Sequence, residues 1–166
     1  MHFVNPAPGV VVVVERDGHV LLCRRGPGTG VEGRWCLPGG HIEFHEDFIT
    51  AGLREVEEET GLEVEVKGIL SVVSNFWDHG HSTFVAVLLA HPVAGEPQAD
   101  GLEITEVAWF PASGLPQEDM AFVADIHIIE RYFATRESGA RVDPAYVRLA
   151  GRDPDYAPPP ASRHPW

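Results

Sequence analysis

The chain has few cysteines, a single lysine and no long hydrophobic segment. Its 166 residues include two cysteines, Cys23 and Cys36, too few for a disulfide framework, and their apolar surroundings indicate reduced, buried thiols. No apolar run approaches the roughly 18 residues that suggest a membrane helix. The first residues, MHFVNPAPG, lack the charged and apolar regions of a secretory signal. We therefore expect a cytoplasmic protein without a membrane partner.

Positive charge is scarce as well. The formal net charge is -13, from 25 acidic and 12 basic residues, and Lys67 is the only lysine. Nonspecific binding of DNA or RNA requires a basic face, so this composition argues against a nucleic-acid partner. It does not argue against a small molecule that carries phosphate, because a bound cation inverts the local charge.

Much of the acidity lies in the segment LPGGHIEFHEDFITAGLREVEEETGL. Within it, Ile49, Leu53 and Val56 recur at i, i+4 and i+7, which predicts a helix over about residues 47–60 with these three on its apolar face. Gly61 is suited to end this helix in a left-handed cap.

Three carboxylates share one side of the predicted helix. At about 100° per residue, Glu55, Glu58 and Glu59 fall within an arc about 100° wide. Their mutual repulsion costs helix stability, and a divalent cation would reverse that cost. Oxygen ligands suit Mg²⁺ or Mn²⁺, and carbonyl groups of the Gly39-Gly40 turn would add a further oxygen. The alternative is a solvated acidic helix face.

The spacing around these acids matches a known pattern. Counting from Gly40, five residues lead to Glu46 and seven more to Arg54-Glu55-Val56, with Glu58-Glu59 and Gly61-Leu62 each following after one residue. All nine constrained positions match. The chain therefore resembles the Nudix hydrolases, over these 23 residues and, more weakly, over residues 8–135.

The resemblance implies an activity and a set of roles. Members of this family cleave nucleoside diphosphates linked to another moiety, with water attacking a phosphorus. By resemblance, Glu58 and Glu59 bind Mg²⁺, with Mn²⁺ as a substitute, and Glu55 binds metal or acts as the base. The resemblance also implies that the Gly39 carbonyl binds metal and that Arg54 orients the catalytic glutamate. Glu46 matches the acid that helps to hold that glutamate in place.

Many members of the family use a further acid from outside this motif. Glu103, six residues before Trp109, is the first candidate for that catalytic and metal-binding role, and Glu106 is the second. The alternative for both is ordinary surface charge before a strand.

Three arginines flank the glycine-rich loop at residues 26–33. Guanidinium groups bind phosphate oxygens in a fork, so Arg24, Arg25 and Arg34 are candidate substrate-binding residues. The alternative is solvent-exposed charge. The loop itself lacks Walker spacing and is expected to be a flexible connection.

The rest of the chain predicts an α/β (α+β) protein. Apolar and β-branched runs predict strands at 10–15, 19–25, 63–76, 82–90 and 106–110, with a hairpin turn at Asp17-Gly18 and a loop at 91–102. A second helix is predicted at 121–134, with Phe122, Ile126, Ile129 and Phe133 on one face and His127 packing near its edge. The resemblance implies a Nudix-type α/β/α sandwich with a mixed β-sheet.

Two regions carry separate expectations. Residues 1–135 are predicted to form the catalytic domain and residues 136–166, rich in Pro and Arg, a C-terminal extension that is docked or flexible. The two histidines of the turn at 77–81 are expected to be exposed loop residues, since no third ligand is spaced with them for zinc.

The substrate is left open by the sequence. Free (deoxy)nucleoside triphosphates, ADP-ribose and other NDP-linked compounds all fit the motif, in a monomer or a homodimer. Two other classes of protein remain as alternatives: a catalytically silent nucleotide-binding module, and an isomerase-type Nudix protein, for which Cys36 near the motif is a candidate ligand.

Overall fold

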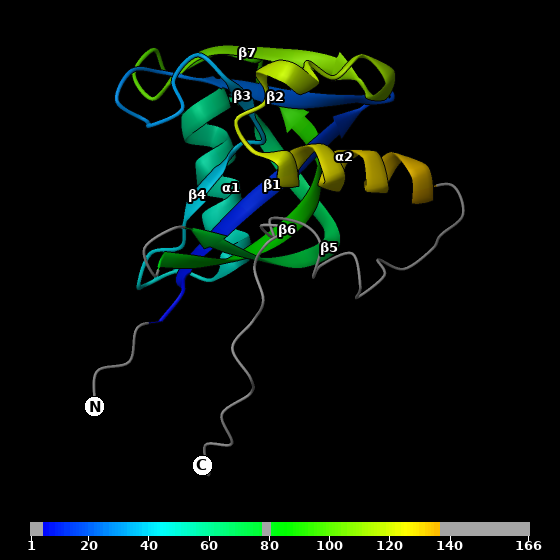
Figure 1. The fold of residues 1–166 in the computed structure, drawn as a ribbon. Helices are drawn as coiled ribbons and strands as arrows, with labels where there is room; N and C mark the ends of the chain where they lie inside the picture. Colours follow the sequence, from blue (N-terminus) through cyan, green and yellow to red (C-terminus); the bar gives the residue numbers. More distant parts are fainter. Residues whose placement is uncertain (1–4, 78–80, 137–166) are drawn as a thin grey trace, which may run out of the picture.

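The computed structural model describes residues 5–77 and 81–136. The predictions for the extension from residue 137 onward and for the tip of the turn at 78–80 therefore lie outside the described residues. The elements follow in the order β1 (Ala7–Arg16), β2 (His19–Arg25), β3 (Trp35–Cys36), β4 (Gly39–His41), α1 (Phe48–Thr60), β5 (Glu63–Trp77), β6 (His81–Ala94), β7 (Ile104–Pro111), two 3-10 turns (Ala112–Gly114, Gln117–Asp119) and α2 (Val123–Thr135) (Figure 1).

The strands form a mixed sheet, as predicted. Its central order is β3-β2-β1-β6-β5, with β4 paired to β1 and β7 paired to β2. Strands β1 and β6 run parallel over the register Ala7↔Thr83 to Val14↔Ala90, and the other pairs are antiparallel. The hairpin turn between β1 and β2 is also confirmed, with positive φ at both Asp17 and Gly18.

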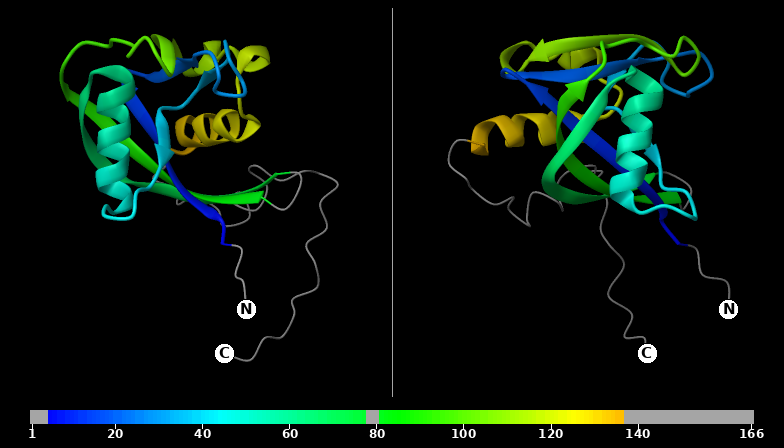
Figure 2. Two further views of the ribbon diagram at one scale, coloured as in Figure 1. Left: turned by 90° about the vertical axis from the view of Figure 1, so that its left-hand side faces the viewer. Right: turned by 180° about the vertical axis from the view of Figure 1, so that it is seen from behind.

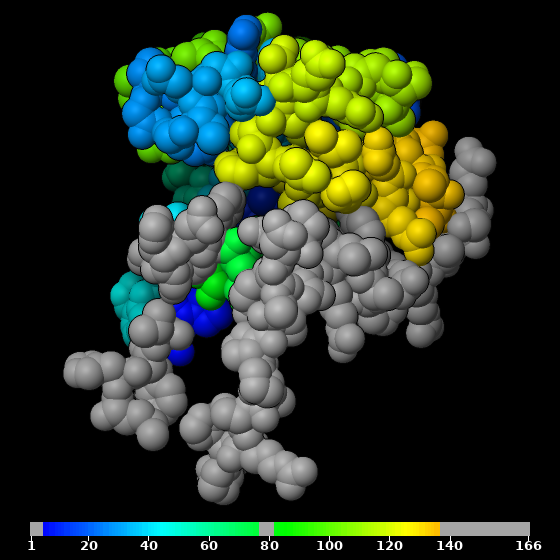
Figure 3. Space-filling view, viewed as in Figure 1, coloured from blue at the N-terminus to red at the C-terminus, as the bar shows by residue number. Residues whose placement is uncertain are grey.

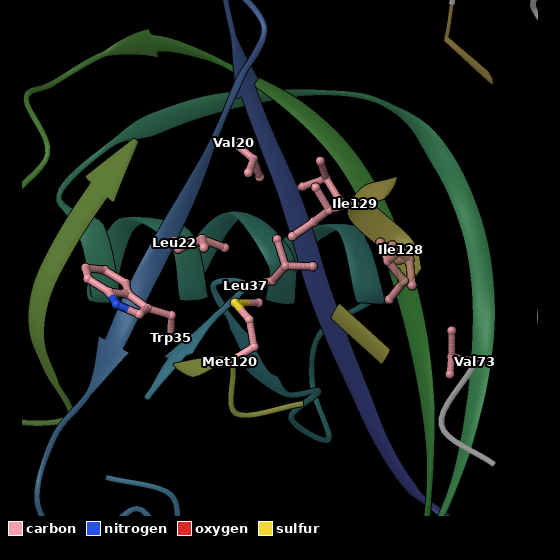
Figure 4. Packing of buried hydrophobic residues seen from close by; sticks show 10 residues of the cluster. Val20, Leu22, Trp35, Leu37, Val73, Met120, Ile128 and Ile129 are labelled. Atoms are coloured by element: carbon pink, nitrogen blue, oxygen red, sulfur yellow. The ribbon is translucent and has the colours of Figure 1, made fainter. Parts of the chain in front are cut away.

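The two helices cover opposite faces of the sheet (Figure 2). Alternate residues of β1 point to opposite sides, and both sides are buried. Val10, Val12 and Val14 pack with α1 residues in one cluster, whereas Val13 packs with Ile128 and Ile129 of α2 in the other. Figure 4 shows that second cluster, in which side chains of β2, β3 and α2 meet. Burial on both faces explains the continuous valine run of β1, and the α/β/α sandwich is confirmed.

Helix α1 has the predicted extent but buries a different face. Asp47 caps its start by accepting bonds from the N–H groups of Ile49 and Thr50, and Gly61 ends it at φ 68°. Ile49 and Leu53, predicted on the buried face, are 40% and 36% exposed, so that prediction was wrong.

Small residues explain why α1 buries a different face from the predicted one. The buried side of α1 consists of Ala51, Gly52, Val56, Glu59 and Thr60. A methyl group added at Gly52 would lie 2.9 Å from a methyl carbon of Leu88. The helix therefore approaches the sheet through its smallest residues, and this orientation turns Glu59 inward.

Other boundaries also differ from the predictions. The turn at Pro38-Gly39-Gly40 contains a short strand, because β4 pairs with β1, and the loop predicted to begin at residue 91 begins after Ala94. Helix α2 buries Ala124, Asp125, Ile128 and Ile129; of the predicted face only Ile129 is fully buried, whereas Phe122, Ile126 and Phe133 are partly buried. His127 is exposed, so its predicted packing role was wrong.

The segment before α2 packs beside the strands near the start of the chain, as the space-filling view shows (Figure 3). Arg34 Nη1 donates to the Glu118 carbonyl at 3.0 Å, and the Ala121 N–H donates to the Trp35 carbonyl at 2.7 Å. These bonds hold the entry to α2 against β3. Among the described residues, no helix has the length and apolar character needed to cross a membrane.

Candidate active site

A cleft of about 820 Å³ is lined by residues of both helices and of the strands of the sheet. One side is formed by β4 and α1, with Gly39, Gly40, Arg54, Glu55 and Glu59, and the loop before β7 adds Glu103. The other side is formed by residues of α2 and of the hairpin β5–β6. Four of the predicted metal-site residues, Gly39, Glu55, Glu59 and Glu103, thus line one cleft although they span 64 positions of the chain.

Glu59 is the most deeply buried of the acids, with 7% of its surface exposed. Its Oε2 accepts a hydrogen bond from the Gly39 N–H at 2.9 Å. Burial, with a smaller contribution from the charges of Glu55 and Glu103, raises the pKa of Glu59 to about 8 against the opposing effects of the Gly39 N–H bond and Arg25. The surroundings of Glu59 therefore contain too little positive charge to make its ionised form favourable.

Gly39 presents main-chain groups to the same place. The Val12 N–H donates to the Pro38 carbonyl at 2.9 Å, and bonded pairs alternate along an antiparallel ladder. Gly39, opposite Val11, therefore points its N–H and its carbonyl away from β1, toward the side where Glu59 accepts. Its φ is 153°, and a Cβ would lie 2.2 Å from the Val10 carbonyl oxygen, so only glycine fits.

Glu55 lies against Gly40. A Cβ at Gly40 would be 2.4 Å from Glu55 Oε1, so glycine at this position makes room for the carboxylate. Burial raises the pKa of Glu55, while the hydrogen bond from Arg54 and its charge lower it. A carboxylate whose pKa is raised by burial is a better proton acceptor than a fully exposed one.

Arg54 links the acids of the site. Its guanidinium donates to both carboxylate oxygens of Glu46, to Glu55 Oε1 at 2.9 Å and to Glu58 Oε2 at 3.2 Å, and also to the His41 carbonyl. The bonds from Arg54 lower the pKa of Glu46. Glu46 thus anchors one edge of the guanidinium while Arg54 fixes the position of Glu55, and the 2.9 Å contact is a close, charge-assisted hydrogen bond.

The remaining predicted acids are at different depths. Glu58 is at the rim, with its side chain 60% exposed, and it is not among the residues that line the cleft. Glu103 lines the cleft, and its carbonyl accepts from the Gly26 N–H at 2.7 Å, which ties its loop to β2. Glu106, the second candidate, pairs with Arg24 at 3.1 Å outside the cleft.

Of the three candidate arginines, only Arg25 reaches the cleft. Its guanidinium lies 5.7 Å from the Phe122 ring, and its Nε is buried without a hydrogen-bond partner among the described residues. Arg24 is occupied by Glu106 and the Gly33 carbonyl, and Arg34 by the carbonyl of Glu118. Alternation along β2 sends neighbouring side chains to opposite faces, which explains why Arg24 and Arg25 differ.

The donors present fit a hard divalent cation. Carboxylate oxygens and a main-chain carbonyl are the ligands that Mg²⁺ prefers, and the buried Glu59 carboxylate lacks a compensating charge. Within residues 5–77 and 81–136, no three His, Cys, Asp or Glu side chains are already gathered at coordinating distance. Arg54 holds Glu55 and Glu58 instead, so cation binding requires these contacts to be exchanged.

The opposite side of the cleft contains Asn75, Thr83 and Asp125, which the sequence did not single out, and His127, which was predicted only to pack. Apolar side chains such as Val73 and Ile128 lie beside them. Asp125 is 4% exposed, and burial raises its pKa to about 7. The signal in the sequence was an acid at the helical spacing itself, because Asp125 lies three residues after Phe122 and four before Ile129.

Comparisons with known proteins agree with this geometry. A model of the NUDIX domain matches residues 5–132. The chain is 30% identical to an ADP-ribose pyrophosphatase of Methanocaldococcus jannaschii, over 69% of this chain and 68% of that protein. It is 34% identical to the NAD-capped RNA hydrolase NudC of Edwardsiella ictaluri, over 67% of this chain but only 41% of NudC. A Nudix hydrolase from Nitrosomonas europaea superimposes with a TM-score of 0.74 and 29% identity, covering 84% of this chain and 77% of that one. The chain therefore belongs to the Nudix hydrolase family.

Proposed function

We propose that this protein is a divalent-metal-dependent hydrolase that cleaves the diphosphate linkage of a nucleoside diphosphate joined to another group. The observation that carries the proposal is the convergence of Gly39, Glu55, Glu59 and Glu103 in one cleft, with Arg54 bonded to Glu55. An acidic site of this kind cannot hold a diphosphate without a cation, because the like charges repel.

We assign metal binding to five groups of the chain. Glu58, Glu59, Glu55, Glu103 and the Gly39 carbonyl would hold Mg²⁺, with Mn²⁺ as a substitute. When bound, the ion neutralises phosphate charge and lowers the pKa of water.

Proton transfer is assigned to two acids that line the cleft. We infer that Glu55, which is bonded to Arg54 and through it linked to Glu46, accepts the proton of the attacking water, and Glu103 is the second candidate. Arg25 is the candidate for contact with phosphate oxygens, since it is the one of the three arginines that lines the cleft.

The size of the cleft and the named activities of the relatives support a proposal for the substrate class. A volume of about 820 Å³ is within the range of small-molecule sites. The relatives are named for hydrolysing ADP-ribose and NAD-capped RNA, and both substrates contain a nucleoside diphosphate linked to another group. We therefore propose ADP-ribose, (d)NTPs or related nucleotides as substrates, in a monomer or a homodimer.

The two other classes of function are less well supported. A catalytically silent module would be expected to lack acids of the motif, whereas all of them are retained here. In the isomerase-type alternative Cys36 would bind metal as a thiolate. Burial raises the pKa of Cys36 to about 12, which disfavours the thiolate.

A substrate panel tests the proposal. The purified protein is incubated with NTPs, dNTPs, ADP-ribose, NADH and nucleotide sugars, with Mg²⁺, with Mn²⁺ and with EDTA, and the products are identified by mass. We expect cleavage of at least one diphosphate that depends on the metal. No turnover of any compound with either ion, together with no binding of Mn²⁺ in calorimetry, would favour the silent module.

A further inference from the structure

Glu103 lies in the loop between β6 and β7, in a segment that packing alone does not fix. Leu102 before it is 78% exposed and Glu103 itself is exposed, whereas Ile104 after it is buried at the start of β7. Glu103 nevertheless lines the same cleft as Glu55 and Glu59. A side chain that binds a metal ion needs a well-defined position, so other interactions have to hold this part of the loop.

Asp100 accepts hydrogen bonds from both sides of Glu103. Its Oδ1 accepts from the Leu102 N–H at 2.7 Å and from the Ile104 N–H at 2.9 Å. The Gly101 N–H donates to the Ile104 carbonyl at 2.9 Å, and Gly101 has a φ of 78°, a conformation that favours glycine. One carboxylate oxygen therefore closes a short turn that contains Glu103.

The residue after β2 fixes where this turn lies. The Gly26 N–H donates to the Glu103 carbonyl at 2.7 Å, and a Cβ at Gly26 would lie 2.4 Å from the Leu102 carbonyl oxygen. The pairing of β7 with β2 also shifts its register between Arg24 and Arg25, an irregularity that redirects side chains next to a site. The turn is thus held beside Arg25, which lines the cleft.

The two sets of bonds meet on one peptide group. The peptide that joins Glu103 to Ile104 has its carbonyl bonded to Gly26 and its N–H bonded to Asp100. A peptide group held at both its oxygen and its nitrogen cannot rotate freely. The direction in which the Glu103 side chain leaves the main chain is therefore set by Asp100 and Gly26 together.

We propose that Asp100 is a positioning residue, which holds the Glu103 carboxylate at the acidic end of the cleft so that it binds the cation. The inference deepens the proposed function and rests on it for the role of Glu103. Asp100 is exposed and is not among the residues that line the cleft, so it acts through the main chain on either side of Glu103. Both N–H groups require an oxygen acceptor at this place rather than a charge.

The test is the affinity for Mn²⁺, measured by calorimetry, of Asp100→Ala, Asp100→Asn and Glu103→Gln, with Glu96→Ala as the matched control. Alanine removes the acceptor, whereas the amide removes the charge but keeps an oxygen for the two N–H groups. Glu96 is an exposed acid of the same loop and is not among the residues that line the cleft. Thermal unfolding checks the fold of each variant. Asp100→Glu keeps the charge but displaces the oxygens by one methylene, and it decides the test if the alanine variant does not fold.

We expect Asp100→Ala to weaken Mn²⁺ binding about 10- to 100-fold, the effect of removing a group that orients a metal ligand. Asp100→Glu should weaken it as well, and Glu103→Gln at least as much, whereas Asp100→Asn and Glu96→Ala should remain close to the wild type. Asp100→Ala combined with Glu103→Gln should bind as Glu103→Gln does alone, because both changes act through one carboxylate.

Three results would overturn the inference. They are wild-type affinity in both Asp100→Ala and Asp100→Glu, a loss that Asp100→Asn shares, and losses that add in the double variant.

The binding measurement also separates this inference from the proposed function, because it requires no turnover. The expected pattern of affinities without cleavage of any compound in the panel supports the role of Asp100 and contradicts the proposed hydrolysis. Metal-dependent cleavage with unchanged affinity in Asp100→Ala leaves the proposed function standing and overturns the role of Asp100. A wild type that does not bind Mn²⁺ overturns both.

Discussion

Replacing Asp125 by Asn should stabilise the protein, and the gain should grow with pH. Asp125 is 4% exposed, and its pKa is raised from the ordinary 3.8 to about 7 by burial, against the opposing effects of the Leu37 N–H and Arg25. A raised pKa means that the folded state disfavours the ionised acid. The wild type therefore loses stability as the pH rises from about 4 to about 7, and the loss then levels off. The amide does not titrate and keeps the bond to Leu37.

The size of the effect follows from the same two pKa values. Each unit of pKa difference corresponds to about 1.4 kcal/mol, so the advantage of Asp125→Asn in free energy of unfolding should be about 2 kcal/mol at pH 5 and about 4 kcal/mol at pH 8. The titrations of Glu59 and the other groups of the cleft occur in both proteins and cancel in this difference. The predicted signal is the increase of roughly 2 to 3 kcal/mol between the two pH values.

The assay is urea unfolding of both proteins in EDTA at pH 5, 6, 7 and 8. Glu130→Gln serves as the control, because this exposed acid lies on the same helix, and its difference from the wild type should stay nearly constant. An Asp125→Asn advantage that is independent of pH, or that shrinks as the pH rises, would refute the description of Asp125 as a buried acid.

Two further substitutions test the geometry of the acidic end. Gly39→Ala places a Cβ 2.2 Å from the Val10 carbonyl oxygen at a φ of 153°, so we expect the free energy of unfolding, measured in urea, to fall by about 3 kcal/mol. Gly68→Ala, where the space is open, should lower it far less. Equal effects of the two changes would contradict the packing of β4 on β1. Arg54→Met removes the bonds to Glu46, Glu55 and Glu58. We expect kcat with Mg²⁺ to fall about 100-fold with a smaller change in KM, and an unchanged kcat would show that Arg54 does not position the base.

The features predictable from the sequence were those with a local cause. The helix end at Gly61, the Asp17-Gly18 hairpin and the buried strand β1 each depend on residues close together in the chain. The buried face of α1 was predicted wrongly because the largest apolar residues were assumed to be the contact. The helix instead packs through Gly52, and this contact becomes apparent only when the position of Leu88 opposite it is known.

The candidate site was predictable on one side only. The spacing of the motif indicated the acids of α1, and Glu103, a candidate from its place before a strand, lines the same cleft. Asp125 was missed because its burial depends on Leu37, 88 positions away. The sequence likewise could not predict that Arg25 lines the cleft while Arg24 and Arg34 do not. All three are close to the glycine-rich loop, and only the pairing of the strands shows which side chain enters the cleft.

The central claim is that the acids of α1 hold a cation that is needed for diphosphate hydrolysis. The most direct measurement is Mg²⁺-dependent turnover, on the best substrate of the panel, by Glu58→Gln and by Glu57→Gln. Both changes remove one charge from an exposed position of the same helix, but only Glu58 shares the arc of Glu55 and Glu59 and bonds to Arg54. We predict that Glu58→Gln abolishes turnover while its thermal unfolding is preserved, and that Glu57→Gln retains turnover. Full turnover in Glu58→Gln, or an equal loss in both variants, would contradict the assignment of the site.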